Sequence, residues 1–578
     1  MDFEGEFAVI FEQNVEVPMR DGTVLRADVW RPNVSGQFPV LLERTPYDKT
    51  TSSESNLGAG DFYASHGYAT VIQDVRGRFA SDGEFYPFRD DGDGINRDGY
   101  DTVEWASEQT WSNGKVGTIG GSYSGATQYR MLSTQPPHLV AQFVRQSSSD
   151  YYREWVYRDG AFEQGFNVAW TLKHTATNAR KLAPNGKEDE VYRRVNQASD
   201  DYLDWLERTP ISHLHPVADL HDWFADWMSH PNNDEYWDQF SILRTHDRVN
   251  VPVHHFGSWY DCFLRGTLEN YSGMRANAIT PEVRAAQRLT IGPWVHDPSP
   301  ADMRKAGAVD FGAQARLGWF TTRLRWFEHW LKGVDNGVDL DKPVKLFTMG
   351  INKWREFDDW PPKGIKYAAY YLSEEGSGSA NSLNDGILTS VKPETPSELF
   401  DEYESDPGYP IRSFGGGHLG DSNGPQDQRG YENRVLTYTT EVLDEPLDVT
   451  GPVKAVLHAS STAVDTDWVV RITDVYPDGT SMLVCDGILR ARFKDSFDAP
   501  KPLITNMITE FEVDLWATSH VFKKGHRLRI AVASSGFPRW DRNWQTGRNN
   551  SYETSGVVAR NRIYRDLNHP SHILLPLL

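Results

Sequence analysis

Residues 116–132, VGTIGGSYSGATQYRML, constrain the fold of this chain more than any other segment. The segment begins as a short apolar run, stops at two glycines, presents Ser122 and continues with a helix-forming sequence. A serine at a sharp turn from strand to helix needs small neighbours, which the glycines and Gly125 supply. Ser124 replaces the second glycine of the usual G-x-S-x-G pattern. The segment favours a nucleophile turn, with a plain strand-to-helix connection as the alternative.

The length and charge of the chain exclude several classes of protein. Its 578 residues predict two to four domains at about 150 residues each. A formal charge of -22 disfavours nucleic acid and anionic membrane surfaces as partners. Cys262 and Cys485 are too few for a disulfide framework or a cysteine-rich zinc site. We expect a cytoplasmic protein without a signal peptide or membrane span, and the oligomeric state stays open, with a homodimer as one candidate.

The first 149 residues alternate strand-like and helix-like segments. Residues 7–29 alternate apolar and polar side chains around a turn at residues 20–22, which predicts a hairpin at a sheet edge. Short apolar runs then follow, separated by helical or loop segments, at residues 39–42, 68–73, 116–120 and 139–144. Strands separated by helices predict a parallel sheet that is covered on both faces.

The rest of the chain predicts an insertion and a second kind of domain. Residues 150–242 have a helical, aromatic-rich sequence, after which strand-like runs resume, so we predict a helical cap over the strand ends. The α/β domain would comprise residues 1–149 and 243–360, closed by an amphipathic helix at residues 317–331. Residues 361–578 contain short strands with turn signals, which predict an all-β sandwich or jelly roll.

Two later loops supply the partners that a serine nucleophile needs. The serine requires a base to take its proton and a carboxylate to fix the tautomer of that base. Asp261 follows a strand predicted to end at Gly257, and His296 follows one predicted to end near Gly292. Both therefore lie at the carboxyl ends of parallel strands, as Ser122 does, and the order Ser, Asp, His is that of α/β-hydrolases.

Other residues are weaker candidates for these roles. His254 and His255 fall inside a predicted strand, where packing is the more common role. Asp297 is adjacent to His296, and side chains of adjacent residues usually point apart. The acidic run at residues 90–94 lacks the ligand spacing of an EF-hand. We therefore expect neither a metal nor another cofactor.

Six motifs are distributed along nearly the whole chain: RTPYDK (44–49), DVRGRFASDGEF (74–85), NGKVGTIGGSYSG (113–125), GSWYDCF (257–263), GPWVHD (292–297) and SSGFPRWDRN (534–543). They resemble the bacterial cocaine esterase family, which is related to X-prolyl dipeptidyl peptidases and α-amino acid ester hydrolases. The resemblance implies an α/β-hydrolase domain, a helical cap inserted into it and a C-terminal jelly roll.

The resemblance also implies roles for individual residues. Ser122 would be the nucleophile, Asp261 the acid and His296 the base. The hydroxyl of Tyr47 and the backbone N–H of Tyr123 would form the oxyanion hole, since an acyl-transfer intermediate needs donors aimed at its oxyanion.

For the substrate, the resemblance implies an ester with an aromatic or bulky apolar acyl group. Trp155, Trp170 and Phe263 match the positions that enclose the acyl group in that family. The match weakens at residues 415–419, so it does not extend to cocaine as the substrate. We expect a carboxylesterase that acts on a small-molecule ester through an acyl-enzyme.

Two other functions are alternatives. An amidase, a dipeptidyl peptidase or an α-amino acid ester hydrolase would need carboxylates to hold a substrate ammonium, and the loop at residues 261–263 offers only Asp261, already used. A noncatalytic carbohydrate-binding protein could use the jelly roll, but it would not need a nucleophile, a base and an acid.

Overall fold

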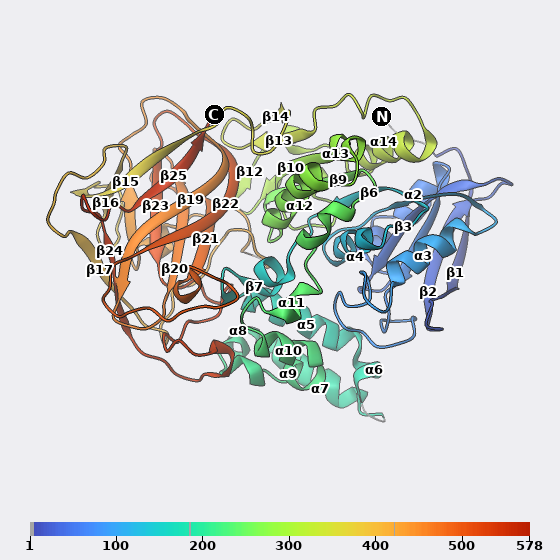
Figure 1. Ribbon diagram of the computed structural model, residues 1–578, viewed down its shortest axis with the longest axis horizontal. Helices are drawn as coiled ribbons and strands as arrows, with labels where there is room; N and C mark the ends of the chain where they lie inside the picture. The colour runs from blue at the N-terminus through green and yellow to red at the C-terminus, as the bar shows by residue number, and fades with distance from the viewer. Residues whose placement is uncertain (1–4, 184–185, 421) are drawn as a thin grey trace.

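The computed structural model of the chain describes residues 5–183, 186–420 and 422–578. Figure 1 shows a sheet with helices on it in the N-terminal half, a group of helices below, and a β-rich part formed by the C-terminal residues. These are the α/β part, the helical part and the all-β part that the sequence predicts. In the described ranges no helix combines the length and the apolar character needed to cross a membrane.

The α/β sheet begins with the predicted hairpin, β1 (Val9–Pro18) and β2 (Val24–Pro32), which pair antiparallel. Its order among the described residues is β1-β2-β4-β3-β5-β6-β9-β10-β13-β14, and the strands from β4 to β13 along this order are parallel. The other bounds are β3 (Phe38–Thr45), β4 (Ala69–Asp74), β5 (Ser112–Thr118), β6 (Leu139–Arg145), β9 (Val253–Tyr260), β10 (Arg288–Val295), β13 (Val344–Thr348) and β14 (Lys353–Phe357).

Helices cover both faces of this sheet, as predicted. Leu41 belongs to a buried cluster with residues of α2 (Ala59–Ser65) and α14 (Trp319–Lys332). Its two neighbours along β3 belong to another cluster, with residues of α3 (Asp98–Ser107) and α4 (Tyr123–Met131). Because successive side chains of a strand alternate between faces, the two clusters lie on opposite sides of the sheet. The carboxyl ends of β5, β9 and β10 are left at one rim.

The helical cap lies between β6 and β9 along the chain, below the sheet in Figure 1. It starts with a π-helical turn (Tyr151–Val156) and contains a short pair of strands, β7 (Tyr157–Arg158) and β8 (Ala161–Phe162), which the sequence did not predict. Its longer helices are α5 (Gln164–Thr177), α7 (Glu188–Asp200) and α10 (Asp222–Ser229).

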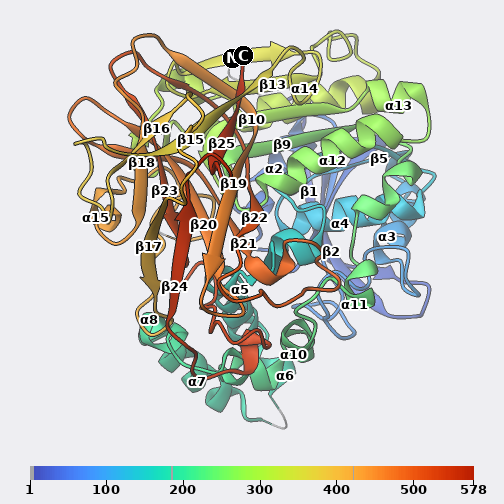
Figure 2. The same ribbon diagram turned by 60° about the vertical axis from the view of Figure 1, so that its left-hand side comes forward.

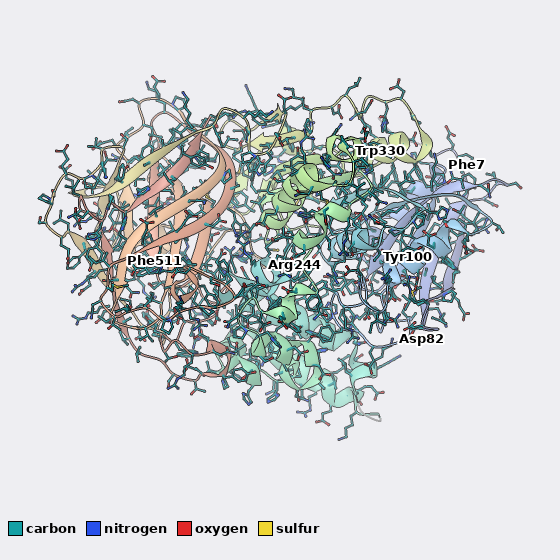
Figure 3. All side chains as sticks on the ribbon, in the orientation of Figure 1. Phe7, Asp82, Tyr100, Arg244, Trp330 and Phe511 are labelled. Atoms are coloured by element: carbon teal, nitrogen blue, oxygen red, sulfur yellow. The ribbon has the colours of Figure 1, made fainter. Side chains whose placement is uncertain are left out.

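The C-terminal part is all β and stands beside the sheet in both Figure 1 and Figure 2. Phe511 of β22 (Thr509–Phe522) lies among its strands (Figure 3), with its ring centre 5.4 Å from that of Trp468 in the core. Its strands are β15 (Lys366–Gly376), β16 (Gly386–Thr389), β17 (Phe400–Ser405), β18 (Leu436–Thr439), β19 (Leu447–Ser461), β20 (Asp467–Val475), β21 (Ser481–Arg490), β22 (Thr509–Phe522), β23 (Arg527–Ala533), β24 (Ala559–Tyr564) and β25 (His572–Leu577).

The all-β part holds the beginning of cap helix α5. The Gly165 N–H donates to the Pro538 carbonyl at 2.8 Å, and the Trp540 indole N–H donates to the Glu163 carboxylate at 3.0 Å. Residues of the SSGFPRWDRN motif therefore support the cap.

Candidate active site

Ser122 occupies a strained turn between β5 and α4. Its backbone has φ 56° and ψ −122°, a conformation that a residue with a side chain rarely adopts. The Ser122 N–H donates to the carbonyls of Arg145 and Gln146 at 3.0 and 3.1 Å, which holds the turn from the neighbouring strand β6. A Cβ at Gly125 would lie 2.7 Å from the Ser147 Cβ. The close approach of α4 to Ser147 therefore requires glycine at position 125. This agrees with a motif in which Ser124 occupies the usual glycine position and the glycine comes one residue later.

The predicted acid and base meet at the same rim of the sheet. Asp261 comes directly after β9 and His296 directly after β10, and the Nδ1 atom of His296 lies 2.8 Å from Oδ1 of Asp261. Asp261 is completely buried. The hydrogen bond fixes Nδ1 as the protonated nitrogen beside a carboxylate, which leaves Nε2 to act as a base. Ser122 and His296 line one cavity.

The rival residues have other partners. His255 lies inside β9, where burial lowers its pKa to about 3 and its ring nitrogens contact the Tyr129 hydroxyl and the Gln287 amide. His254 contacts the hydroxyl of Thr290 at 2.9 Å. The Asp297 carboxylate accepts the N–H of the residue two positions later and makes no hydrogen bond to His296.

A residue that the sequence did not single out connects the three loops. Gln146 is completely buried with φ 47°, and its carbonyl accepts the Ser122 N–H. Its side-chain amide donates to the Val295 carbonyl and to the Ser258 hydroxyl, both at 2.7 Å, and accepts the Asp297 N–H at 3.1 Å. The Gln146 side chain thus bonds to Val295 and Asp297, the two neighbours of His296, and to Ser258 in β9, the strand that precedes Asp261. Nothing in the local sequence QSSS indicates this.

The hydroxyl of Tyr47 is prepared to donate a hydrogen bond. The indole N–H of Trp170 lies 3.0 Å from it, and because an indole nitrogen can only donate, the tyrosine oxygen accepts and its own proton stays available. Burial raises the pKa of Tyr47, which keeps the hydroxyl protonated. The Tyr123 N–H is in the first turn of α4, where backbone donors lack partners within the helix. The Tyr123 hydroxyl instead accepts the Phe88 N–H.

The cavity beside Ser122 has a volume of about 960 Å³ and is lined by both apolar and polar side chains. The apolar ones include Phe79, Phe166, Trp170, Tyr202 and Leu419. The polar ones include Ser53, Asn56, Ser124, Arg145 and Ser299. The cavity could therefore hold an ester with both an apolar and a polar part.

Of the three aromatic residues predicted to line the pocket, only Trp170 does so. Trp155 and Phe263 are completely buried and stack on each other, with ring centres 4.6 Å apart and planes at 15°. They form a layer behind the wall, where Phe263 meets the His296 ring edge to face at 5.4 Å. The prediction missed Phe166, which lies one turn before Trp170 on α5 and lines the cavity.

The side chains that could share a metal ion, among those the structure describes, are Asp261, Cys262 and His296, whose donor atoms lie within 4.8 Å of one another. Burial raises the pKa of the Cys262 thiol well above its usual value, which disfavours the thiolate that a metal would need. Asp261 and His296 are also hydrogen-bonded to each other. The arrangement fits proton transfer better than metal binding.

Comparison with known proteins gives consistent matches over almost the whole chain. Residues 21–298 match the X-Pro dipeptidyl-peptidase (S15 family), and residues 336–574 match the X-Pro dipeptidyl-peptidase C-terminal non-catalytic domain. A cocaine esterase from Rhodococcus sp. (strain MB1 Bresler) is 36% identical over 606 aligned positions, covering 100% of this chain and 99% of the relative. A putative serine esterase from Mycobacterium bovis is 27% identical, covering 97% and 94%.

Two solved structures are similar along their full length. An α-amino acid ester hydrolase is 26% identical with a TM-score of 0.81, covering 100% of this chain and 98% of the other. An aminopeptidase from a marine sediment archaeon, Thaumarchaeota archaeon, is 26% identical with a TM-score of 0.80, covering 100% and 97%. Together with the sheet order, these matches confirm the predicted α/β-hydrolase domain with its cap and C-terminal all-β domain.

Proposed function

Because this chain belongs to the cocaine esterase family and is a serine ester hydrolase, we propose that Ser122, Asp261 and His296 form its catalytic triad. The observation that carries the proposal is the 2.8 Å hydrogen bond between His296 and Asp261, in the wall of a cavity that Ser122 also lines. An imidazole held in this way by a buried carboxylate is a suitable base for a serine hydroxyl.

The reaction would proceed as two acyl transfers. His296 takes the Ser122 proton as the serine oxygen attacks the ester carbonyl, and the oxyanion receives hydrogen bonds from the Tyr47 hydroxyl and the Tyr123 N–H. His296 then gives its proton to the departing alcohol, which leaves an acyl-enzyme. Water repeats the attack with His296 again as base, and the carboxylic acid leaves as Ser122 regains its proton.

The apolar side chains that line the cavity favour an aromatic or bulky apolar acyl group. Phe166 and Trp170 offer ring surfaces beside Ser122, and burying apolar area against them contributes about 25 cal/mol per Å². An enzyme for α-amino acyl esters or peptides is the second candidate, because two similar structures carry those names. It would need the cavity carboxylates, Asp48 and Asp297, to hold a substrate ammonium.

Substitution of the nucleophile tests the proposal. Ser122→Ala should abolish hydrolysis of an activated aromatic ester and labelling by a fluorophosphonate, without lowering the melting temperature. Ser124→Ala, two residues along the same turn, is the matched control and should keep the label. Hydrolysis by Ser122→Ala at the wild-type rate, or a label on another residue, would overturn the assignment.

A further inference from the structure

The cavity beside Ser122 contains a buried arginine without a carboxylate partner. Arg145, the last residue of β6, is 3% exposed, and a Cβ built on Gly121 would lie 2.4 Å from its guanidinium carbon. No carboxylate oxygen of the described residues forms an ion pair with it, although Arg145 lines the cavity. Burial lowers the pKa of Arg145, which is the expected cost of removing an arginine from water.

The hydrogen bonds of this guanidinium are incomplete. Its Nη1 atom donates to the Gln146 side-chain carbonyl at 3.0 Å and to the Asp297 backbone carbonyl, and both acceptors are neutral. Its Nε atom is enclosed without a partner, and Nη2 makes no hydrogen bond to the described residues. The Trp319 ring, whose centre lies 5.9 Å from the guanidinium carbon, adds a cation–π contact but no strong hydrogen-bond acceptor. The hydrogen bonds of this buried cation therefore stay incomplete without a further acceptor.

No nearby carboxylate forms an ion pair with Arg145, although the charges of Glu54, Asp297 and Asp261 favour its cationic form. Burial, reinforced by the charge of Glu54, raises the pKa of Glu43, which favours the neutral form of that carboxyl group. Glu54 itself is paired with Arg323 through contacts of 2.6 and 2.8 Å. Asp297, which also lines the cavity, directs its carboxylate to the Ser299 N–H at 2.9 Å.

The other charges of the cavity are a second cation and a second carboxylate. Lys173, on the cap helix, forms no ion pair with a described carboxylate, and its ammonium lies 5.4 Å from the centre of the Tyr47 ring. Asp48 accepts the backbone N–H and the hydroxyl of Thr50. Both cations thus lack an anionic partner among the described residues, whereas both carboxylates already accept hydrogen bonds from their own turns.

We propose that Arg145 binds a carboxylate of the substrate, so that the preferred esters carry an anionic group in addition to their apolar part. Because Nε is enclosed and Nη1 already has acceptors, Nη2 would donate a charge-assisted hydrogen bond to one oxygen of the carboxylate. The inference rests on the proposed esterase function and adds its substrate class. It also separates this chain from relatives named for amino substrates, because two unpaired cations repel an ammonium group.

The source of the carboxylate can be the acyl side or the alcohol side of the ester. The first series compares aryl esters whose acyl chains have similar length and differ only at the distal end. That end is a carboxylate, a methyl ester or an amine. The second series compares benzoyl esters of 4-hydroxybenzoate and of methyl 4-hydroxybenzoate. In one of the two series the anionic ester should have a kcat/KM about 10- to 100-fold above that of its neutral partner. In the first series the ester that ends in an amine should be the poorest substrate.

Arg145→Gln should bring the ratio of anionic to neutral kcat/KM close to one, even if it lowers both rates through the lost contact to Asp297. Arg145→Lys keeps the positive charge but loses the planar N–H donors of the guanidinium. It should retain part of the anionic-to-neutral ratio of kcat/KM. Arg288→Gln is the matched control, since Arg288 is also buried and bound by carbonyl groups but does not line this cavity. It should keep the wild-type ratio.

The outcomes separate this inference from the proposed function. If the wild type hydrolyses the neutral esters and shows no anionic preference in either series, the inference is wrong and the esterase function stands. If Arg145→Gln keeps the anionic preference, Arg145 is not its cause. If no ester is hydrolysed and no fluorophosphonate label appears, both proposals fail. If Arg145→Gln does not fold, the ratios of the wild type and of Arg145→Lys still support or overturn the inference.

Discussion

The rim of the sheet and the wall of the cap meet at one cavity but are built in different ways. At the rim, directional hydrogen bonds of 2.7 to 3.1 Å join Ser122, Gln146 and the neighbours of His296. In the cap wall and the layer behind it, aromatic rings contact one another: Trp155 stacks on Phe263, and its ring centre lies 5.2 Å from that of Phe166 in the wall. Hydrogen bonds fix the position of atoms, whereas ring contacts fill space and exclude water.

This difference predicts two kinds of mutational effect. Removing a group at the rim should lower kcat, because the geometry of proton transfer and of the oxyanion hole depends on small displacements. Removing part of the cap wall should change stability or acyl preference and leave the chemistry of small esters largely intact. Substitutions in the two regions should therefore differ in which quantity they change as well as in the size of the change.

Apart from the loss of the Ser122 nucleophile, the largest effect is expected at Tyr47. Tyr47→Phe removes the hydroxyl that accepts the Trp170 N–H and is free to donate to an oxyanion, and kcat should fall about 10²- to 10³-fold. Steady-state kinetics with a neutral aromatic ester measure this effect. Tyr202→Phe is the control, because its hydroxyl lies in the same cavity but donates to the Gly165 carbonyl, and it should change kcat only a few-fold. An unchanged kcat in Tyr47→Phe would remove this residue from the oxyanion hole.

A smaller but clear effect is expected at Gln146. Gln146→Met keeps the size of the side chain and removes its hydrogen bonds to Val295, Asp297 and Ser258, so kcat should fall about 10- to 100-fold with little change in KM. Fluorophosphonate labelling of Ser122 should slow by a similar factor, which a merely structural role would not cause.

Gln142→Met is the matched control for this substitution. Gln142 is also completely buried on β6, but its amide donates to the Gln128 carbonyl, away from the loops of the site. If both variants lose stability equally and keep the same kcat, Gln146 only supports the core. If Gln146→Met alone loses kcat, its amide positions the catalytic loops.

The same contrast explains what the sequence could predict. The strand ends and the order Ser122, Asp261, His296 follow from local patterns, since the ends of parallel strands share one edge of a sheet. The role of Gln146 could not be predicted, because it depends on a side chain that reaches Val295, far away in sequence. The pocket role of Trp155 came from the family resemblance alone, which does not show where a side chain points, and in the structure Trp155 is buried against Phe166 and Phe263.

One signal for the cavity wall was present in the sequence and remained unused. Phe166, Trp170, Lys173 and Thr177 recur at helical spacing along α5, and all four line the cavity. Residues three or four apart share one face of a helix, so the position of Trp170 was enough to indicate Phe166 and Lys173. The orientation of α5 that brings this face to Ser122 comes from its contacts with the all-β domain, which no local pattern records.

The smallest effects on turnover are expected in the cap wall, where two aromatic residues should behave differently. Trp155→Phe shrinks a completely buried ring whose indole N–H has no partner among the described residues, so it should lower the free energy of unfolding by about 1 to 3 kcal/mol without changing acyl preference. Phe166→Leu alters the cavity surface, and it should reduce the preference for aromatic over acetyl esters about 10-fold with little loss of stability. Denaturant unfolding and an acyl-chain series measure the two effects. If Trp155→Phe changes the acyl preference as much as Phe166→Leu does, the layer behind the wall also shapes the pocket. That layer would then be a third region, beside the rim and the wall.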